Sequence, residues 1–401
     1  MLVHLVKSFD RIGPFWVAII FAILVGNGVY LTRNLVATWV PDDPSIVTAG
    51  DVIRGNDFFA FWTAAHLAAN GEAETVYDKI AIRAAQKQFA SVETTEDRRF
   101  LYPPTFLLML LPLGHLPYLP ALSLWQVLPF VGFLLVMARM GLPPFFYWML
   151  PFSAAVVQTI VTGQNGLLTA LFLAGGFFSL ERKPRIAGIL LALFTYKPQF
   201  ALLIVAALII GGYWRALGAM MATIAVVTIV SLAVFGSEAW LAFFETVFFA
   251  QEQLTLGNVP WWRMPTIFVA ARMSGFNETS AHLVQGIFAL GVFAGVAWAW
   301  WHRLPFNLKV SLLIAAIPLA TPWAHEYDQV ILLLPIAWLI LVGQGKPLSH
   351  LEIAIIVLVW MLPSPWTLAL VQETGISFGP LILLAFYGLI LNRALRAPRA
   401  V

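Results

Sequence analysis

Long apolar stretches recur along the whole chain, and they restrict it to the few folds that a lipid bilayer permits. About 20 consecutive apolar residues are needed to cross the hydrocarbon core of a bilayer. Of the 401 residues, 60% are hydrophobic and 11% are charged, whereas soluble domains are about half apolar and a quarter charged. Because a soluble globule of this composition could not cover its apolar surface, we expect an all-α polytopic membrane protein. A soluble enzyme, a nucleic-acid-binding protein and a disordered chain are excluded.

The first apolar run begins at Pro14 and continues to about Leu31. It is too long for the core of a cleaved signal peptide, and no small-residue cleavage site follows it, so we interpret it as an uncleaved membrane helix. The chain has no cysteine, which excludes disulfides and thiolate chemistry. The later apolar segments are 104–118, 121–138, 145–162, 166–180, 186–196, 199–212, 216–235, 279–301, 307–322, 328–343, 351–371 and 376–392.

Basic residues in short loops predict which ends of these segments are cytoplasmic. The densest basic turn is 181–185, with the sequence ERKPR, and both ends of the chain are also basic. We therefore place 37–102 on the opposite side as a first outer loop, 236–262 as a second outer loop, and the turn 322–328 beside them. The other basic residues assigned to the cytoplasmic side are Lys7, Arg11, Arg215, Arg303, Lys309, Lys346, Arg393, Arg396 and Arg399.

The number of crossings follows from the position of the two chain ends. If all of the apolar segments crossed, the two basic ends would lie on opposite sides, so we predict about 12 transmembrane helices in a single domain of residues 1–401. We expect 104–118 not to cross, because it is short and contains Pro112. The alternative is one broken helix over 186–212, interrupted at Pro198, but it would place the 181–185 turn outside.

The first outer loop carries signals for helices of its own. Asn56 and Asp57 precede an apolar and aromatic stretch that Gly71 ends, a pattern typical of an N-capped helix with a glycine stop. We expect this helix to lie in the membrane interface, where aromatic side chains gather. A second helix is predicted from about Asp78 to Phe89.

A few ionisable residues lie within or beside the apolar segments, where a charge is costly and usually has a function. Asp57 is a candidate acid or base at the mouth of a cavity, or alternatively only the cap of its helix. Asp51 is a second carboxylate nearby, or a solvated loop acid. Lys197, just before Pro198, would bind an anionic phosphate from the outer leaflet, or else extend to lipid headgroups.

Other polar residues gather at the predicted outer turns. His325 and Glu326 lie in the sequence TPWAHEYD, where histidine is a candidate phosphate ligand or acid/base partner and Glu326 a helix cap or part of the cavity. Gln164 and Asn165 form a polar turn between two apolar segments. Tyr102 precedes a pair of prolines and is first of all a turn residue. Candidates for lining the substrate cavity are Glu326, Gln164, Asn165 and Tyr102.

These motifs, taken in order, resemble those of glycosyltransferase family 87, whose members are integral-membrane enzymes of the GT-C superfamily that use polyprenyl-phosphate sugars. The resemblance extends over about residues 14–343. Its blocks are DFFAFWTAA from Asp57, LYPP ending at Pro104, GQNGLL from Gly163, AGIL from Ala187 with YKPQ ending at Gln199, and TPWAH ending at His325.

The resemblance implies a GT-C-like fold and a mechanism. An acidic residue in the first outer loop deprotonates an acceptor hydroxyl, which displaces the lipid phosphate with inversion at the anomeric carbon of a sugar that is often mannose. Asp57 matches the position of this general base. His325 matches a residue expected near the phosphate.

The expected partners are membrane lipids, the polyprenyl-phosphate sugar donor and a lipid or glycan acceptor, with no nucleic acid. We expect no cofactor and no obligatory metal. The expected location is the plasma (inner) membrane, with the active site facing the periplasm or exterior. A transporter or lipid-linked-sugar flippase is the alternative function, but we find no internally related halves of the kind that transporters show.

Overall fold

The computed structural model describes residues 13–39, 46–48, 52–90, 98–302, 304–343 and 348–397. Within these ranges the protein is helical, and its β structure is limited to one isolated bridge between Val47 and Ile53. The predicted all-α class is therefore confirmed. The helices are α2 (Pro14–Trp39), α3 (Phe58–Ala69), η1 (Ala73–Tyr77), α4 (Lys79–Ala90), α5 (Pro104–Gly114), α6 (Tyr118–Ala138), α7 (Pro144–Met149), η2 (Leu150–Phe152), α8 (Ala154–Thr162), α9 (Gly166–Ser179), α10 (Pro184–Leu193), α11 (Pro198–Ile210), α12 (Trp214–Leu256), η3 (Trp261–Arg263), α13 (Ile267–Met273), α14 (Glu278–Trp301), α15 (Phe306–Ala320), η4 (Glu326–Leu332), α16 (Leu333–Gly343), α17 (His350–Met361), α18 (Pro365–Thr374) and α19 (Gly379–Leu395).

Among the described helices, four are long and apolar enough to cross a membrane, namely α2, α6, α12 and α14. The number rises to six if each of two bent helix pairs counts as one span. Several of the other apolar segments form helices of only 10–17 residues. At about 1.5 Å per residue, these are shorter than the roughly 30 Å hydrocarbon core. The count of about 12 crossings stays a prediction.

Two segments that we predicted as continuous helices are bent. The segment 145–162 consists of α7 with η2 followed by α8, at an angle of 41°. The segment 351–371 is divided into α17 and α18, which meet at 83°. In the second case Ser364 caps the new helix and Pro365 occupies its first turn. Proline is tolerated there because the backbone amides of a first turn have no partner within the helix.

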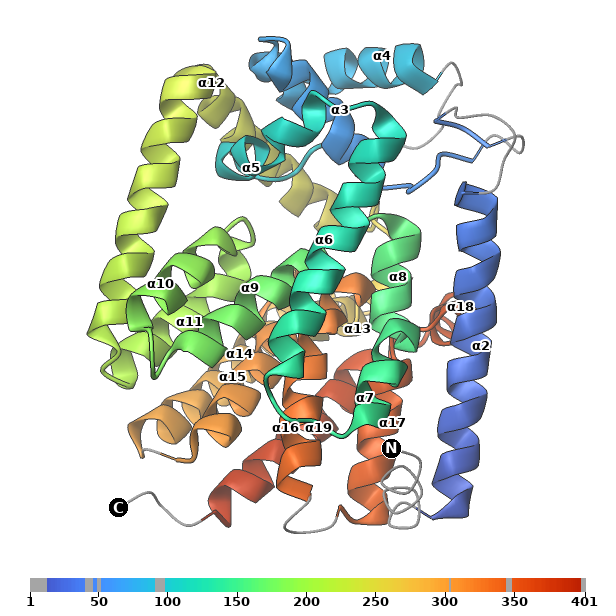
Figure 1. Cartoon of the computed structure of the whole chain (residues 1–401), viewed down its shortest axis with the longest axis vertical. Helices are drawn as coiled ribbons and strands as arrows, with labels where there is room; N and C mark the ends of the chain where they lie inside the picture. The colour runs from blue at the N-terminus through green and yellow to red at the C-terminus, as the bar shows by residue number, and fades with distance from the viewer. Residues whose placement is uncertain are drawn as a thin grey trace.

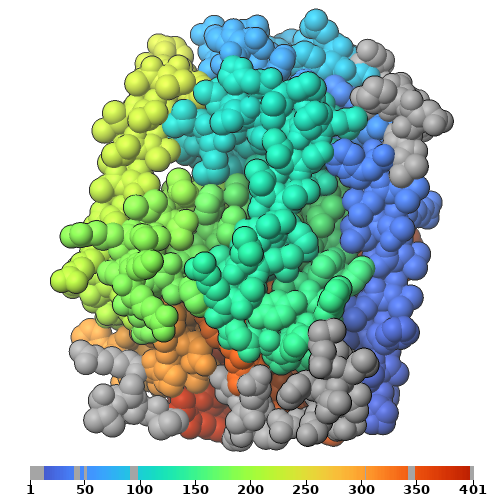
Figure 2. Space-filling model, viewed as in Figure 1, coloured from blue at the N-terminus to red at the C-terminus, as the bar shows by residue number. Residues whose placement is uncertain are grey.

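Two of the long helices, α2 and α12, stand at opposite edges of the molecule (Figure 1). The space-filling view shows α2 along one edge and α12 along the other (Figure 2). Side chains such as Phe21 and Val29 of α2 and Ile229 and Val234 of α12 are exposed. Apolar side chains exposed along a long apolar helix are suited to contact with lipid acyl chains.

The first outer loop packs at one end of the molecule. Helices α3, α4 and α5 lie at the upper end in Figure 1, whereas α2 begins and α19 ends at the lower end. The second outer loop is largely helical, because α12 continues past a non-helical residue, Gly236 (φ 78°), as a second limb. This limb contacts α5 and η1. The two predicted outer loops therefore pack on one another.

Helix α3 begins one residue after Asp57, as the capping signal predicts, and α4 agrees with the second predicted helix. The aromatic side chains of α3, which are the ground for expecting this helix in the membrane interface, pack against protein; the position of α3 relative to the membrane stays a prediction. Nearly all of its side chains are buried, and its aromatic rings pack against Phe106, Tyr118 and Trp125. The aromatic residues therefore form a protein core that holds the residues before α3 in a fixed position.

Some sequence predictions concern residues outside the described ranges. These are Lys7, Arg11, Asp51, Arg303, Lys346 and Arg399.

Candidate active site

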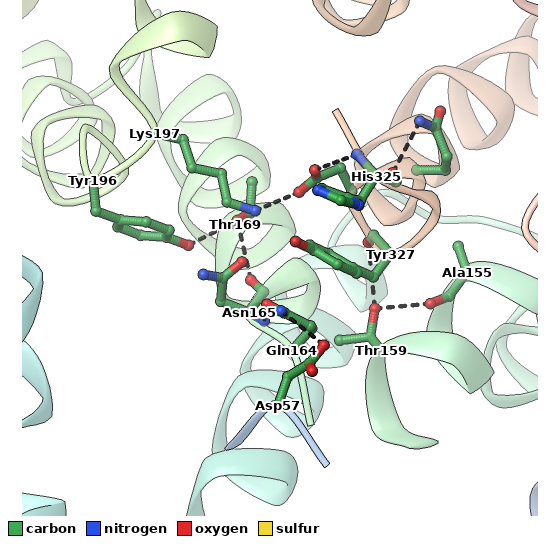
Figure 3. A network of polar contacts seen from close by, with 12 residues as sticks. Asp57, Ala155, Thr159, Gln164, Asn165, Thr169, Tyr196, Lys197, His325 and Tyr327 are labelled. Carbon is green, nitrogen blue, oxygen red and sulfur yellow. Dashed lines mark hydrogen bonds and ion pairs between the residues drawn. The ribbon is translucent and has the colours of Figure 1, made fainter. Parts of the chain in front are cut away.

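Polar side chains from separate parts of the chain meet where η4 packs against α8 and α9 (Figure 3). Asp57 comes from the residues before α3, and Gln164 and Asn165 from the turn between α8 and α9. Lys197 precedes α11, and His325 precedes η4. Side chains that we selected from distant motifs thus lie in one cluster.

Two glycines in the turn between α8 and α9 permit this assembly. A Cβ atom on Gly163, which has a φ of +67°, would lie 2.1 Å from the carbonyl oxygen of Gly55. A Cβ on Gly166 would lie 2.2 Å from the carbonyl oxygen of Tyr327. Neither position has room for a side chain without movement of the backbone. The turn therefore brings the first outer loop and η4 against the same pair of helices.

Asp57 is half-buried, and its carboxylate faces Gln164. The Gln164 Nε2 donates a hydrogen bond of 3.0 Å to Asp57 Oδ2, and the Asp57 amide donates to the carbonyl oxygen of Thr162 at 2.9 Å. The alternative role of Asp57 as a side-chain cap is wrong, because its carboxylate forms no capping hydrogen bond to α3. The preceding residue, Asn56, has a φ of 39° and accepts a hydrogen bond from Arg98 Nη2 at 2.8 Å.

Lys197 forms an ion pair with Asp328, and both side chains are almost fully buried. The other carboxylate oxygen, Asp328 Oδ2, accepts a hydrogen bond from the backbone amide of His325 at 2.9 Å. The alternative in which Lys197 extends to lipid headgroups is therefore wrong. Asp328 both caps its turn and holds the lysine. The role of Lys197 toward phosphate stays a prediction.

Arg263 is a site residue that the sequence did not reveal. It lies at the end of η3 and forms an ion pair with Glu326 Oε1, to which its Nε donates at 2.8 Å and its Nη2 also donates. The side chain of Arg263 is 18% exposed and that of Glu326 only 1%. Burial raises the pKa of Glu326 to about 7, although Arg263 acts in the opposite direction. The predicted helix-capping role of Glu326 is replaced by this pairing.

The imidazole of His325 stacks on the ring of Tyr327, with 5.2 Å between the ring centroids and an angle of 8° between their planes. Loss of hydration, and then the positive charges of Arg263 and Lys197, lowers the pKa of His325 to about 3. The imidazole is therefore neutral at pH 7 and can donate one hydrogen bond from whichever nitrogen carries the proton.

Tyr102 and Asn165 line the same cluster. The Tyr102 hydroxyl lies beside the Asn165 amide and the Tyr327 hydroxyl, while the amide nitrogen and oxygen of Asn165 form no hydrogen bond of ordinary geometry. A buried amide in this state costs free energy unless a ligand or water supplies partners. Asn165 is thus suited to bind hydroxyl groups of a substrate.

Within the described ranges, no three His, Asp or Glu side chains lie close enough together to hold a metal ion. The expectation of no obligatory metal stays a prediction.

The fold and the site define a helical membrane protein whose polar centre combines a half-buried carboxylate with two buried or nearly buried cations. The family model of glycosyltransferase family 87 matches residues 100–322, which is more than half of the 401 residues. The chain therefore belongs to glycosyltransferase family 87 and is a membrane glycosyltransferase. Family membership favours this function over the alternative of a transporter.

The matched range contains Tyr102, Gln164, Asn165, Lys197 and Arg263, whereas Asp57, His325 and Glu326 lie outside it. The curated proteins and the solved structures contain no match to the chain.

Proposed function

We propose that the protein transfers a hexose, with mannose as the first candidate, from a polyprenyl-phosphate donor to a hydroxyl group of a lipid or glycan acceptor. The observation that supports this proposal is the position of Asp57. Its carboxylate lies in the same cluster as Lys197 and Arg263, so a proton acceptor and groups that attract a phosphate are available together.

The chemistry is a displacement at the anomeric carbon. Asp57 takes the proton of the acceptor hydroxyl as its oxygen attacks, and the bond to the phosphate oxygen breaks on the opposite face, which inverts the configuration. No large shift of the aspartate pKa is needed, because the lipid phosphate is a good leaving group. Cations and hydrogen-bond donors fixed around the phosphate stabilise the charge that develops on it.

The phosphate-binding groups in this proposal are Lys197, Arg263 and His325. The two cations are held in place by Asp328 and Glu326 before the donor arrives. Asn165 and Tyr102 contact the hydroxyl groups of the sugar. No cofactor takes part, since the lipid phosphate itself carries the activated sugar.

The site lies toward the end of the molecule formed by α3, α4 and α5 (Figure 1). We place this end on the extracytoplasmic side of the plasma (inner) membrane, with the lipid chain of the donor in the outer leaflet. The proposal follows from the basic turn 181–185 and the basic tail.

The test is sugar transfer by the purified protein in nanodiscs, with a radiolabelled polyprenyl-phosphate hexose and an extract that supplies acceptors. We expect release of polyprenyl phosphate with wild type and a loss of about 100-fold or more with Asp57→Asn, the usual range for a general base. Asp78→Asn is the matched control, because Asp78 is an exposed acid of the same loop that caps α4. Transport of the intact donor without release of polyprenyl phosphate would contradict the proposal.

A further inference from the structure

Arg263 lies between two carboxylates. It donates hydrogen bonds to Glu326, and the charge of Asp57 also acts on it. The carboxylates of Asp57 and Glu326 are close enough to repel one another. Arg263 therefore faces more than one acid before any substrate is bound.

The hydrogen bonds of this pair are unequal. Both Nε and Nη2 of Arg263 donate to the same atom, Glu326 Oε1. The second oxygen, Oε2, is buried and has no hydrogen-bond partner among the described residues. The oxygens of a buried carboxylate normally accept several hydrogen bonds. Glu326 thus leaves part of its acceptor capacity unused in the empty site.

A bound donor would add a third negative charge. A sugar attached to a polyprenyl phosphate makes a phosphodiester, which carries one negative charge. Because like charges in a buried site repel strongly, a phosphate beside Arg263 favours protonation of the acid nearest to it. Asp57 receives a hydrogen bond from Gln164, and Asp328 is paired with Lys197. Glu326, with its unpartnered oxygen, is the acid whose protonation costs least.

We propose that Arg263 binds the phosphate of the lipid donor and that Glu326 takes up one proton when it does so. The proposal rests on the proposed function and adds a role for this ion pair in donor recognition. In the empty site Glu326 keeps Arg263 charged and in place. In the occupied site the protonated carboxyl remains beside Arg263 without competing for its charge, and its O–H can donate to a phosphate oxygen.

The groups that face Glu326 support this assignment. Helices α8, α9 and α16, which pack against η4, carry no Asp, Glu, Lys, Arg or His. On α15 the ionisable group is Lys309, near the opposite end of that helix from η4. Tyr30 of α2 also feels the charges of Arg263 and Glu326. The other ionisable groups on η4 and the segments around it include Asp57, Lys197, Arg263, His325, Tyr327, Asp328, Tyr102 and, next to Asn56, Arg98.

The sign of the pH dependence follows from the direction of the pKa change. The Glu326 pKa is raised to about 7 in the empty protein, and a bound phosphate raises it further. Binding therefore takes up a proton at pH values between the pKa of the empty site and the higher pKa of the occupied site. We expect donor affinity to fall about tenfold for each pH unit between the pKa of the empty site and that of the occupied site.

The experiment measures binding of farnesyl methyl phosphate to the protein in nanodiscs, without acceptor, between about pH 6 and 9. This phosphodiester keeps one negative charge over the whole range, so any pH dependence belongs to the protein. Wild type should lose affinity as the pH rises, whereas Glu326→Gln, which mimics the protonated acid, should bind with an affinity that does not change with pH. Arg263→Ala should weaken binding about tenfold or more at about pH 6.

The control is Glu373→Gln, which removes an exposed acid at the end of α18 and should keep the wild-type pH dependence. A second measurement needs no variant. Calorimetric titration of wild type at about pH 8, in buffers with different heats of ionisation, should show uptake of about one proton per ligand bound.

The outcomes separate the two proposals. Binding by wild type that is independent of pH, or calorimetry without proton uptake, would overturn the role of Glu326 while leaving Asp57-dependent transfer intact. An unchanged affinity in Arg263→Ala would overturn the role of Arg263. If wild type neither bound the phosphodiester nor released polyprenyl phosphate from the radiolabelled donor, the proposed function itself would fail.

Discussion

Two Arg–Glu pairs among the described residues differ in their surroundings. At the lower end of the molecule in Figure 1, Arg393 of α19 holds both oxygens of Glu352 at the start of α17, with N···O distances of 2.6 and 2.9 Å. Glu352 also accepts hydrogen bonds from the amide and the hydroxyl of Ser349. In the candidate active site, Arg263 uses one oxygen of Glu326 and leaves the other without a partner.

The difference separates an ion pair that joins helices from one that is ready for a ligand. Every acceptor of Glu352 is engaged, so the pair fixes α17 against α19 and has nothing further to bind. Glu326 is more deeply buried and less fully bonded. Asn165 and Glu326 both leave buried polar atoms unsatisfied in this cluster, which costs free energy unless a ligand or water supplies partners.

The first prediction tests whether the two pairs face opposite sides of the membrane, and its outcome is all or none. The chain has no cysteine, so single substitutions give unambiguous labelling. Glu238→Cys, on the second limb of α12, should react in whole cells with a maleimide that cannot cross membranes, whereas Lys183→Cys should react only after lysis. Reaction of Lys183→Cys from outside would favour the broken helix over 186–212.

The second prediction concerns the buried pair of Lys197 and Asp328. Lys197→Ala leaves the Asp328 carboxylate buried without its counter-charge, so we expect a loss of about 3–5 kcal/mol in the free energy of unfolding. Removal of both charges in Lys197→Met with Asp328→Leu should recover most of the stability and none of the donor binding. Unfolding followed by tryptophan fluorescence measures the first quantity. If Lys197→Ala alone were as stable as wild type, this would show that water reaches the pair.

The third prediction sharpens the contrast between the two arginines. Arg393→Ala removes a partly exposed pair while Glu352 keeps its hydrogen bonds to Ser349, so we expect a loss of about 1–2 kcal/mol in stability. Its affinity for farnesyl methyl phosphate should stay that of wild type. A variant with weakened phosphate binding would mean that the Arg393 pair supports the site after all.

The smallest expected effect is that of Asp57→Asn on stability. Because the Asp57 carboxylate does not cap α3, the change should alter the free energy of unfolding by less than about 0.5 kcal/mol. Comparison of thermal unfolding midpoints for the variant and for wild type provides the measurement. A large loss of stability would assign Asp57 a structural role and weaken its assignment as the general base.

The sequence was sufficient to predict the helical fold and most of the polar cluster. Apolar runs mark helices because each helix has to bury or expose a long apolar surface, and α6, α14 and α15 agree with the predicted segments within a few residues. Lys197 and Asp57 were recognisable because a charge beside apolar runs is costly and needs a partner. Local sequence could not show which partner, since the distance along the chain from Lys197 to Asp328 is 131 residues.

Arg263 was missed for the same reason. Two tryptophans precede it, and this local pattern is typical of a residue at a membrane surface. Only the contact with Glu326 shows that it belongs to the site. Helix bends could not be predicted from the sequence either, because a proline such as Pro365 predicts a break without predicting its angle.

The turn between α8 and α9 has a consequence for how the protein is made. Through Gly163 and Gly166 it contacts both the segment before α3 and η4, which leave the ribosome far apart in time. No complete site can exist until η4 has been synthesised and inserted, because Asp328 and Glu326 hold the cations. The nascent chain therefore carries Asp57 through most of translation without a complete polar cluster around it.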